Sequence, residues 1–232
     1  METLMNNSNE QIAGVVLCGG SSSRMGQSKA LLPFGDETML QRVLRIMANV
    51  TKPLVVVKAN NQSLPDLPHD VLITQDRTAG QGPLEGIRMG LDALMQNPNG
   101  IQTATAAYVT SCDVPLLEPA FVQAVANNLG NADAVVVVED GFHHPLAAVY
   151  RTSVIPVIDS LLNNGKRRPL CLFDQITTVT VATQDLLFAD PELSSLMNLN
   201  QPDDYLAALQ RVGLKPDPNT IAQFGLLGDS SG

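Results

Sequence analysis

The sequence predicts an α/β domain built on a mostly parallel sheet with helices on both faces. Short apolar runs, several of them rich in β-branched residues, alternate with longer stretches whose apolar residues recur at helical spacing. This alternation is typical of parallel sheets, because each crossover between strands lays a helix against the sheet. With 232 residues, 44% apolar and 16% charged, the chain can bury a full core in one such domain.

The first half of the chain predicts short buried strands separated by helices. Residues 12–18 form an apolar run that ends at a glycine pair, as a buried strand entering a turn does. A helix is expected from Thr38, where one face carries Leu40, Val43, Leu44, Met47 and Val50. Residues 54–57 and 71–73 predict two further strands. Pro83 suits a first helical turn and opens a helix with Leu84, Ile87, Leu91 and Leu94 on one face.

The second half continues the same alternation. Residues 104–112 predict a strand that ends at Asp113, and later strands are expected at residues 134–138, 144–150 and, at an edge, 178–182. Two helices between them are marked by Val122, Val125 and Leu129, and by Val154, Ile158 and Leu161. Pro202 starts a last helix that contains Leu206 and Leu209.

The expected organisation is one domain over residues 12–214 with flexible ends. Residues 1–11 are polar and lack the basic region of a signal peptide. The segment 215–232 is rich in Pro, Asn, Gly and Ser, which predicts a flexible tail. No apolar run reaches the ~20 residues that span a bilayer, so no membrane contact is expected.

Charge and cysteine content narrow the class of ligand. A net charge of −9 disfavours a nucleic-acid partner, whereas local basic residues at Arg24, Lys29 and 166–168 suit a small anionic ligand. The cysteines, Cys18, Cys112 and Cys171, are widely separated and form no CxxC pair. This pattern disfavours a structural zinc site and fits a protein of the reducing cytoplasm.

In parallel sheets ligands bind beyond the carboxyl ends of the strands, so the polar residues there are the candidates. The segment 19–26, Gly-Gly-Ser-Ser-Ser-Arg-Met-Gly, follows the first strand. Its glycines let backbone N–H groups approach phosphate oxygens, and Arg24 and Lys29 can neutralise the charge of a triphosphate. The spacing is neither a P-loop nor GxGxxG, and a plain strand-to-helix connection is the alternative.

Other strand ends carry weaker candidates. Asp113 is a hard oxygen ligand well placed for Mg²⁺, or else a cap of the turn that follows. Asn60 ends the second strand and Asp76 follows the third, where either could serve only the local turn. Asn198 and Asn200 alternate in an extended segment and therefore point to one face.

Further polar residues have a plainer interpretation. Arg167 and Arg168 could bind phosphate, but a charge run is more often a solvated face. His143 and His144 lack a metal-binding context and are expected to be structural or to line the substrate site. Cys112 is expected to be a small buried residue and not a nucleophile.

Taken in order, five segments resemble the molybdenum cofactor guanylyltransferase family. Residues 17–32 are similar to its LxGGxSxRMGxxKxLL signature, within which Cys18 stands where Ala is common. The others are Asp76 with Gly82-Pro83-Leu84-Glu85-Gly86-Ile87, Cys112-Asp113-Val114-Pro115, His144-Pro145-Leu146, and Asn198 to Asp204, within which Gln201 replaces a common Thr. The resemblance implies a Rossmann-like fold of the nucleotide-diphospho-sugar transferase type.

The resemblance also implies roles. The nucleotide-contacting positions are Leu17, Gly19, Gly20, Lys29, Asn60, Asp76 and Asp113. Asn60 is on the base side, Asp76 contacts the guanine nucleotide, and Asp113 binds Mg²⁺. Asn198 and Asn200 are near the metal and the pterin. Arg24, Lys29 and Asp113 are the expected catalytic residues.

The implied activity is transfer of GMP from GTP to the phosphate of molybdenum-bound molybdopterin, with Mg²⁺ as cofactor. Proteins that supply or accept the molybdenum cofactor are further expected partners. A cytidylyltransferase for the same cofactor is the nearest alternative, although its first loop typically reads AAG. A sugar-phosphate nucleotidyltransferase is a more distant one, and a non-catalytic nucleotide-binding regulator is the alternative from another class.

Overall fold

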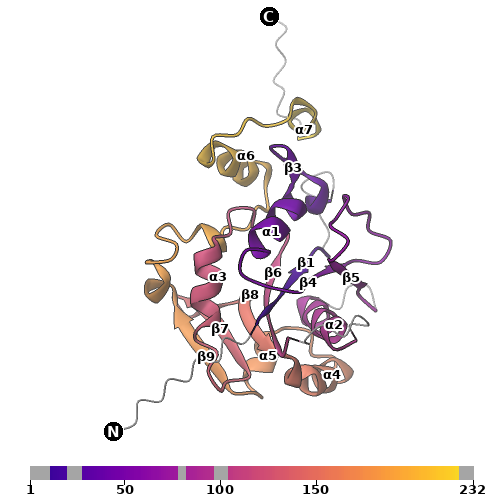
Figure 1. Ribbon diagram of the computed structural model, residues 1–232, viewed down its shortest axis with the longest axis vertical. Coiled ribbons are helices and arrows are strands. Elements are labelled where there is room, and N and C mark those ends of the chain that lie inside the picture. Colours follow the sequence, from indigo (N-terminus) through magenta and orange to yellow (C-terminus); the bar gives the residue numbers. More distant parts are fainter. Residues whose placement is uncertain (1–10, 20–27, 78–81, 97–103, 225–232) are drawn as a thin grey trace, which may run out of the picture.

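The computed structural model describes residues 11–19, 28–77, 82–96 and 104–224. A seven-stranded sheet forms its centre, in the order β5-β4-β1-β6-β8-β7-β9 (Figure 1). Its strands are β1 (Ala13–Leu17), β4 (Leu54–Lys58), β5 (Leu72–Gln75), β6 (Ala106–Ser111), β7 (Ala134–Glu139), β8 (Phe142–Arg151) and β9 (Thr178–Ala182). The strands lie where apolar runs predict them, within two or three residues at each end.

Helices cover both faces of this sheet, as the sequence predicts. One face packs against α1 (Met39–Met47) and α3 (Pro119–Ala126). The opposite face packs against α2 (Pro83–Met95), α4 (Ile155–Asn163) and α5 (Leu170–Phe173). Neighbouring residues of one strand divide between the two cores: Val16 faces the first and Val15 the second, as the two-residue period of a strand requires.

Only β8 runs against the other strands of the sheet. It pairs antiparallel with β6 and β7, whereas the remaining neighbours pair parallel. A tight turn, Asp140-Gly141, joins β7 to β8, and both of its residues have positive φ, 49° and 80°. An Asp-Gly pair is a strong hairpin signal, because its residues tolerate this left-handed backbone. The sheet is therefore mostly parallel, with one reversed strand.

A third, smaller core joins the chain's last helices to a hairpin near its start. The hairpin consists of β2 (Pro33–Phe34) and β3 (Glu37–Thr38), and α6 (Pro202–Arg211) packs on it. Tyr205 of α6 is fully buried there and donates a hydrogen bond to the Pro33 carbonyl. This core lies at one end of the molecule in Figure 1. It brings the segment before α6 next to the segment after the Gly-rich loop.

The tail that was expected to be flexible contains a short helix, α7 (Pro218–Gln223). Asp217 caps it by accepting a hydrogen bond from the backbone N–H of Thr220 at 2.9 Å. The ring of Phe224 then meets Tyr205 edge-on, 5.6 Å between centroids. None of the helices described in the structure is long and apolar enough to cross a membrane.

Candidate active site

The carboxyl ends of the parallel strands bring the candidate residues to one edge of the sheet. β1 lies between β4 and β6, with Leu17 in register with Val57 on one side and Ser111 on the other. Lys58 at the end of β4 is in turn in register with Gln75 of β5. The residues that follow these strands therefore lie along the same edge of the sheet, where ligands of open parallel sheets bind.

Lys29, Asp113 and Asn200 form the centre of this site. The Lys29 Nζ lies 2.8 Å from Asp113 Oδ2 and donates a hydrogen bond to Asn200 Oδ1 at 2.7 Å. The Lys29 and Asp113 side chains are each 16% exposed, so solvent screens the pair only in part. Three segments far apart in the sequence thus contribute one cation, one carboxylate and one amide to a single cluster.

The Asp113 side chain is held from two directions. Ser111, at the end of β6, donates a hydrogen bond from its hydroxyl to Asp113 Oδ1. The Asp113 carbonyl accepts from the backbone N–H of Leu199 at 2.9 Å, which docks the Asn198–Asn200 segment beside it. Leu199 is buried while Asn198 and Asn200 are exposed, so both amides do lie on the same side of the segment.

Asp204 fixes the start of α6 and with it the position of Asn200. Its carboxylate accepts from the backbone N–H groups of Asn200 at 2.9 Å and Gln201 at 2.8 Å. A carboxylate in the first turn also interacts favourably with the helix dipole. Gln201, the N-cap residue of α6, therefore still takes part in capping, because Asp204 accepts from its backbone N–H.

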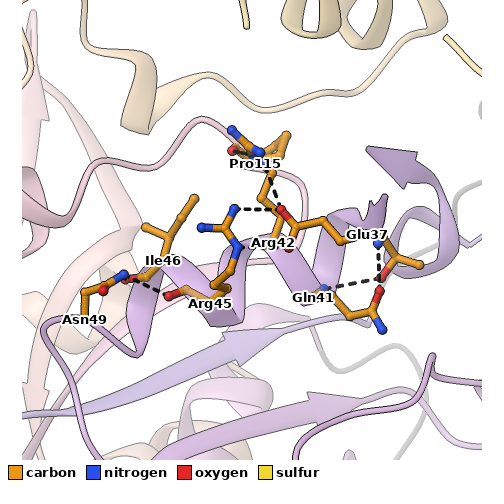
Figure 2. A network of polar contacts seen from close by, with 8 residues as sticks. Glu37, Gln41, Arg42, Arg45, Ile46, Asn49 and Pro115 are labelled. Carbon is orange, nitrogen blue, oxygen red and sulfur yellow. Dashed lines mark hydrogen bonds and ion pairs between the residues drawn. The ribbon is translucent and has the colours of Figure 1, made fainter. Parts of the chain in front are cut away.

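Arg42 of α1 holds the loop after Asp113 at Pro115 (Figure 2). Its Nε donates to the Pro115 carbonyl at 2.7 Å, and its guanidinium lies 4.8 Å from the centroid of the Phe34 ring. Glu37 pairs with Arg42 and with Arg45 one turn further on. Hydrogen bonding to Arg45 lowers the pKa of the Glu37 carboxyl. The Asp113 loop is thus anchored to both α1 and the segment before α6.

Leu17 and Gly19 mark the end of β1 at the site. Leu17 is buried beneath Gly86 of α2, and a Cβ at Gly86 would lie 3.2 Å from the Leu17 side chain. Glycine in the Gly-Pro-Leu-Glu-Gly-Ile segment therefore allows α2 to approach β1 closely. A Cβ at Gly19 would lie 3.2 Å from Asp76 Oδ2, so Gly19 and Asp76 are close neighbours. Gly20 and Arg24 lie outside the described residues.

Asp76 and Asn60 form the other part of the site. Burial, reinforced by the nearby Glu85 carboxylate, raises the pKa of Asp76 to about 6. Glu85, on the first turn of α2, accepts from the backbone N–H of Arg77 at 3.0 Å. Asn60 is exposed in the turn after β4.

One residue that the sequence analysis did not single out joins these parts. Gln62 donates hydrogen bonds from Nε2 to the Cys18 carbonyl and the Ser28 hydroxyl, both at 3.0 Å. Its Oε1 accepts from the backbone N–H of Ala59 at 2.9 Å. A glutamine in a polar loop carries no pattern that would predict this. Ser111, the last residue of β6, was missed as well, because no residue pattern marks a serine that orients a neighbouring carboxylate.

Comparisons with known proteins show the family of this chain. Residues 14–179 match a family described as the MobA-like NTP transferase domain. The chain belongs to this family. Over 206 residues it is 30% identical to a probable molybdenum cofactor guanylyltransferase from Carboxydothermus hydrogenoformans, covering 89% of this chain and 99% of the relative. A protein of the same description from Mycobacterium avium is 36% identical over 203 residues, covering 86% and 96% of the two chains.

Solved structures support the fold. Molybdopterin-guanine dinucleotide biosynthesis protein A from Archaeoglobus fulgidus aligns with a TM-score of 0.67 and 21% identity, over 87% of this chain and 98% of the other. A Mycobacterium tuberculosis protein solved in complex with manganese aligns with a TM-score of 0.54 and 17% identity, over 86% and 98% of the two chains. This MobA-like chain therefore has the nucleotidyltransferase fold that its sequence predicts.

Within the described residues of this MobA-like domain, Cys18, Cys112 and the two histidines of β8 lie in packed surroundings. The Cys18 and Cys112 thiols are buried, and their hydrogen bond, together with burial, raises the pKa of Cys18. A thiol with a raised pKa stays protonated and is a poor nucleophile. His143 stacks on Phe173, 5.7 Å between ring centroids, while burial lowers the pKa of His144. Both histidines belong to β8, which agrees with a structural role.

The basic run Lys166–Arg168 is exposed, as a solvated face would be. It nevertheless lies near the start of α2: a Cβ at Gly82 would lie 3.4 Å from the Arg167 carbonyl. Gly82 has a φ of 79°, which explains why glycine precedes Pro83 at this helix start.

Proposed function

We propose that this protein transfers GMP from GTP to the phosphate of molybdenum-bound molybdopterin. A phosphate oxygen of molybdopterin forms a bond to the α-phosphorus of GTP. The bond from that phosphorus to the α,β-bridging oxygen breaks, and pyrophosphate leaves with the electron pair. The observation that carries the proposal is the Lys29–Asp113–Asn200 cluster at the strand ends of a MobA-like domain. The names of the relatives supply guanine and the molybdenum cofactor.

The chemistry asks for alignment and charge neutralisation more than for a base. The attacking phosphate is already an anion, so no side chain needs to remove a proton. Lys29 is a cation on the segment that follows the Gly-rich loop, and it can exchange Asp113 for phosphate oxygens when the nucleotide binds. Fixed positive charge near the reacting phosphate stabilises the charge that develops in the transition state. In this proposal Arg24 and the loop amides at Gly19 and Gly20 share that role.

Asp113 is the residue that would hold Mg²⁺. The described residues contain no group of three or more His, Cys, Asp or Glu side chains arranged for a metal. Mg²⁺ is nevertheless often held by only one or two carboxylates together with substrate phosphates. The amide oxygen of Asn200 and the carboxylate of Asp113 both accept from the Lys29 ammonium group. When bound, Mg²⁺ would neutralise phosphate charge and polarise the α-phosphoryl group.

The base side would be formed by Leu17, Asn60 and Asp76. Guanine presents N1–H and N2–H₂ donors, and a carboxylate such as Asp76 can accept from both. Cytosine lacks this edge, and a buried acceptor left without a donor costs roughly 1–3 kcal/mol. Asn198 and Asn200, exposed beside Asp113, would meet the pterin substrate. The free cysteines of the described chain suit a reaction in the reducing cytoplasm.

A nucleotide panel tests the proposal. Purified protein is mixed with molybdenum-loaded molybdopterin, Mg²⁺ and one of GTP, CTP, ATP or UTP, and the dinucleotide product is measured. We expect product with GTP that requires Mg²⁺ and accompanies pyrophosphate release. Product mainly with CTP would instead support the cytidylyltransferase alternative. Nucleotide binding without transfer to this acceptor would contradict the proposed transfer and favour a regulator.

A further inference from the structure

We propose that Gln62 is a positioning residue that fixes Cys18 and Ser28, which flank the Gly-rich segment, relative to the base-side turn. This inference rests on the proposed nucleotide site. It adds a residue on which neither the sequence motifs nor the comparisons bear.

Both the nitrogen and the oxygen of the Gln62 side-chain amide are hydrogen-bonded. Nε2 carries two hydrogens, one donated to the Cys18 carbonyl and one to the Ser28 hydroxyl, at 3.0 Å each. Oε1 accepts from the Ala59 backbone N–H at 2.9 Å. The orientation of the amide is determined, since the Cys18 carbonyl can only accept and the Ala59 N–H can only donate. A rotated amide would place two acceptors against each other.

These partners bracket the Gly-rich segment. Cys18 precedes Gly19 at the end of β1, and Ser28 directly precedes Lys29. Gln62 therefore holds the entry and the exit of the segment that is proposed to meet the phosphates. Lys29 follows Ser28 in the chain, and its ammonium group is held separately by Asp113 and Asn200.

The same residue also shapes the turn that carries Asn60. The Ala59 N–H bond to Oε1 closes this turn on one side, and Lys58 Nζ donates to the Gln62 carbonyl at 3.2 Å on the other. Asn61 within the turn has a φ of 59°, a left-handed conformation that asparagine tolerates. Gln62 thus connects the base-side turn to the phosphate-side segment through one rigid amide.

Loss of this connection should weaken nucleotide binding more than chemistry. The amide touches neither the proposed metal ligand nor the reacting phosphate, and its contribution is to preorganise the site. A residue that acts equally in the ground and transition states changes KM while kcat is kept. Removing two hydrogen bonds to backbone and hydroxyl acceptors is expected to raise KM for the nucleotide about tenfold.

The test compares two substitutions of similar size. Gln62→Glu keeps an acceptor for Ala59 but loses both donors and adds a charge. Gln62→Met loses all three hydrogen bonds without adding charge. Gln123→Glu, at an exposed position of α3, makes the same chemical change as the first variant away from the site. Steady-state kinetics with the nucleotide that the wild type uses, and thermal melting, are measured for all of them.

We expect both Gln62 variants to raise KM about tenfold with kcat within about twofold, and the control to match the wild type. A normal KM in Gln62→Met would overturn the proposal, because any effect of Gln62→Glu would then be due to its charge. A lower kcat together with a lower melting temperature, without a change in KM, would also overturn it in favour of a general structural role. A wild type that transfers no nucleotide would refute the proposed function before any variant is compared, so the two failures are distinct.

Discussion

The two parts of the candidate site are built in different ways. On the phosphate side, Lys29, Asp113 and Asn200 contact one another directly, and Ser111 and Asp204 brace them. On the base side, Asn60 is exposed and Asp76 is a half-buried acid whose neighbour, Glu85, is another acid. The first part is assembled through contacts between opposite charges. The second holds like charges close together, an arrangement that a ligand with hydrogen-bond donors would relieve.

This contrast leads us to expect a division of labour. Groups on the phosphate side should set the rate with any nucleotide, because every nucleoside triphosphate presents the same phosphates. Groups on the base side should decide which nucleotide is used.

Asp113→Asn should lower turnover about 10³-fold while the fold stays intact. The substitution keeps the size of the side chain but replaces one acceptor oxygen by an NH₂ group, and it removes both the ion pair with Lys29 and the charge that would hold Mg²⁺. Pyrophosphate release as a function of Mg²⁺ concentration measures the effect. Asp70→Asn, at an exposed position, is the matched control and should behave as the wild type. Wild-type turnover in Asp113→Asn would rule out its role as the metal ligand.

Lys29→Ala should lower turnover about 10²-fold, the order expected when a group that stabilises transition-state charge is removed. The change also leaves Asp113 without the cation 2.8 Å away. Single-turnover rates with saturating nucleotide separate this loss from weaker binding. Lys215→Ala removes an exposed lysine and serves as the control. Near-normal rates would show that Lys29 acts only in the resting structure, as the partner of Asp113.

The preference for GTP over CTP should rise with pH between about 5 and 7 in the wild type. The pKa of Asp76 is raised to about 6, so its carboxylate, the form that can accept from guanine, becomes dominant above that pH. The ratio of kcat/KM for the two nucleotides is the quantity to measure, because protonation of the triphosphates cancels in it. Asp76→Asn should flatten this dependence. A ratio in the wild type that does not change with pH would contradict the assignment.

The smallest expected effect is on stability. An acid whose pKa is raised on folding binds more protons in the folded state, so folding is favoured below the unfolded pKa and loses this contribution as pH rises through about 6. The free energy of unfolding of the wild type should therefore fall relative to that of Asp76→Asn as pH increases from 4 to 7. Urea denaturation at several pH values measures the difference. A difference that is constant or of opposite sign would mean that the pKa of Asp76 is not raised.

Much of the architecture could be predicted because buried strands and helices have apolar residues at characteristic spacings in the sequence. The apolar runs of β1 and β4 and the Gly82-Pro83 start of α2 are visible in the sequence. The direction of β8 was not predicted, since alternating apolar residues define a strand but not its orientation. The Asp140-Gly141 turn was the signal that could have shown it. The β2–β3 hairpin was missed because its strands have two residues each, too few for any period.

The site was predictable to the extent that its residues belong to motifs. Lys29, Asp113 and Asn200 come from separate quoted segments, and the structure brings their side chains into contact. Gln62 and Ser111 act through contacts that exist only after folding, and no residue pattern marks them. Asp204 belongs to the Asn198 to Asp204 motif, so the sequence marks it. Its hydrogen bonds to the backbone N–H groups of Asn200 and Gln201 form only in the folded chain.

We propose that the phosphate side sets the rate and the base side selects the nucleotide. This is tested most directly by measuring two variants with two nucleotides. The values of kcat/KM for GTP and CTP are determined for the wild type, Lys29→Ala and Asp76→Asn under the same conditions. We predict that Lys29→Ala lowers both values by a similar factor and leaves their ratio within about twofold of the wild type, whereas Asp76→Asn reduces the preference for GTP about tenfold. A changed ratio in Lys29→Ala, or an unchanged one in Asp76→Asn, would contradict the account.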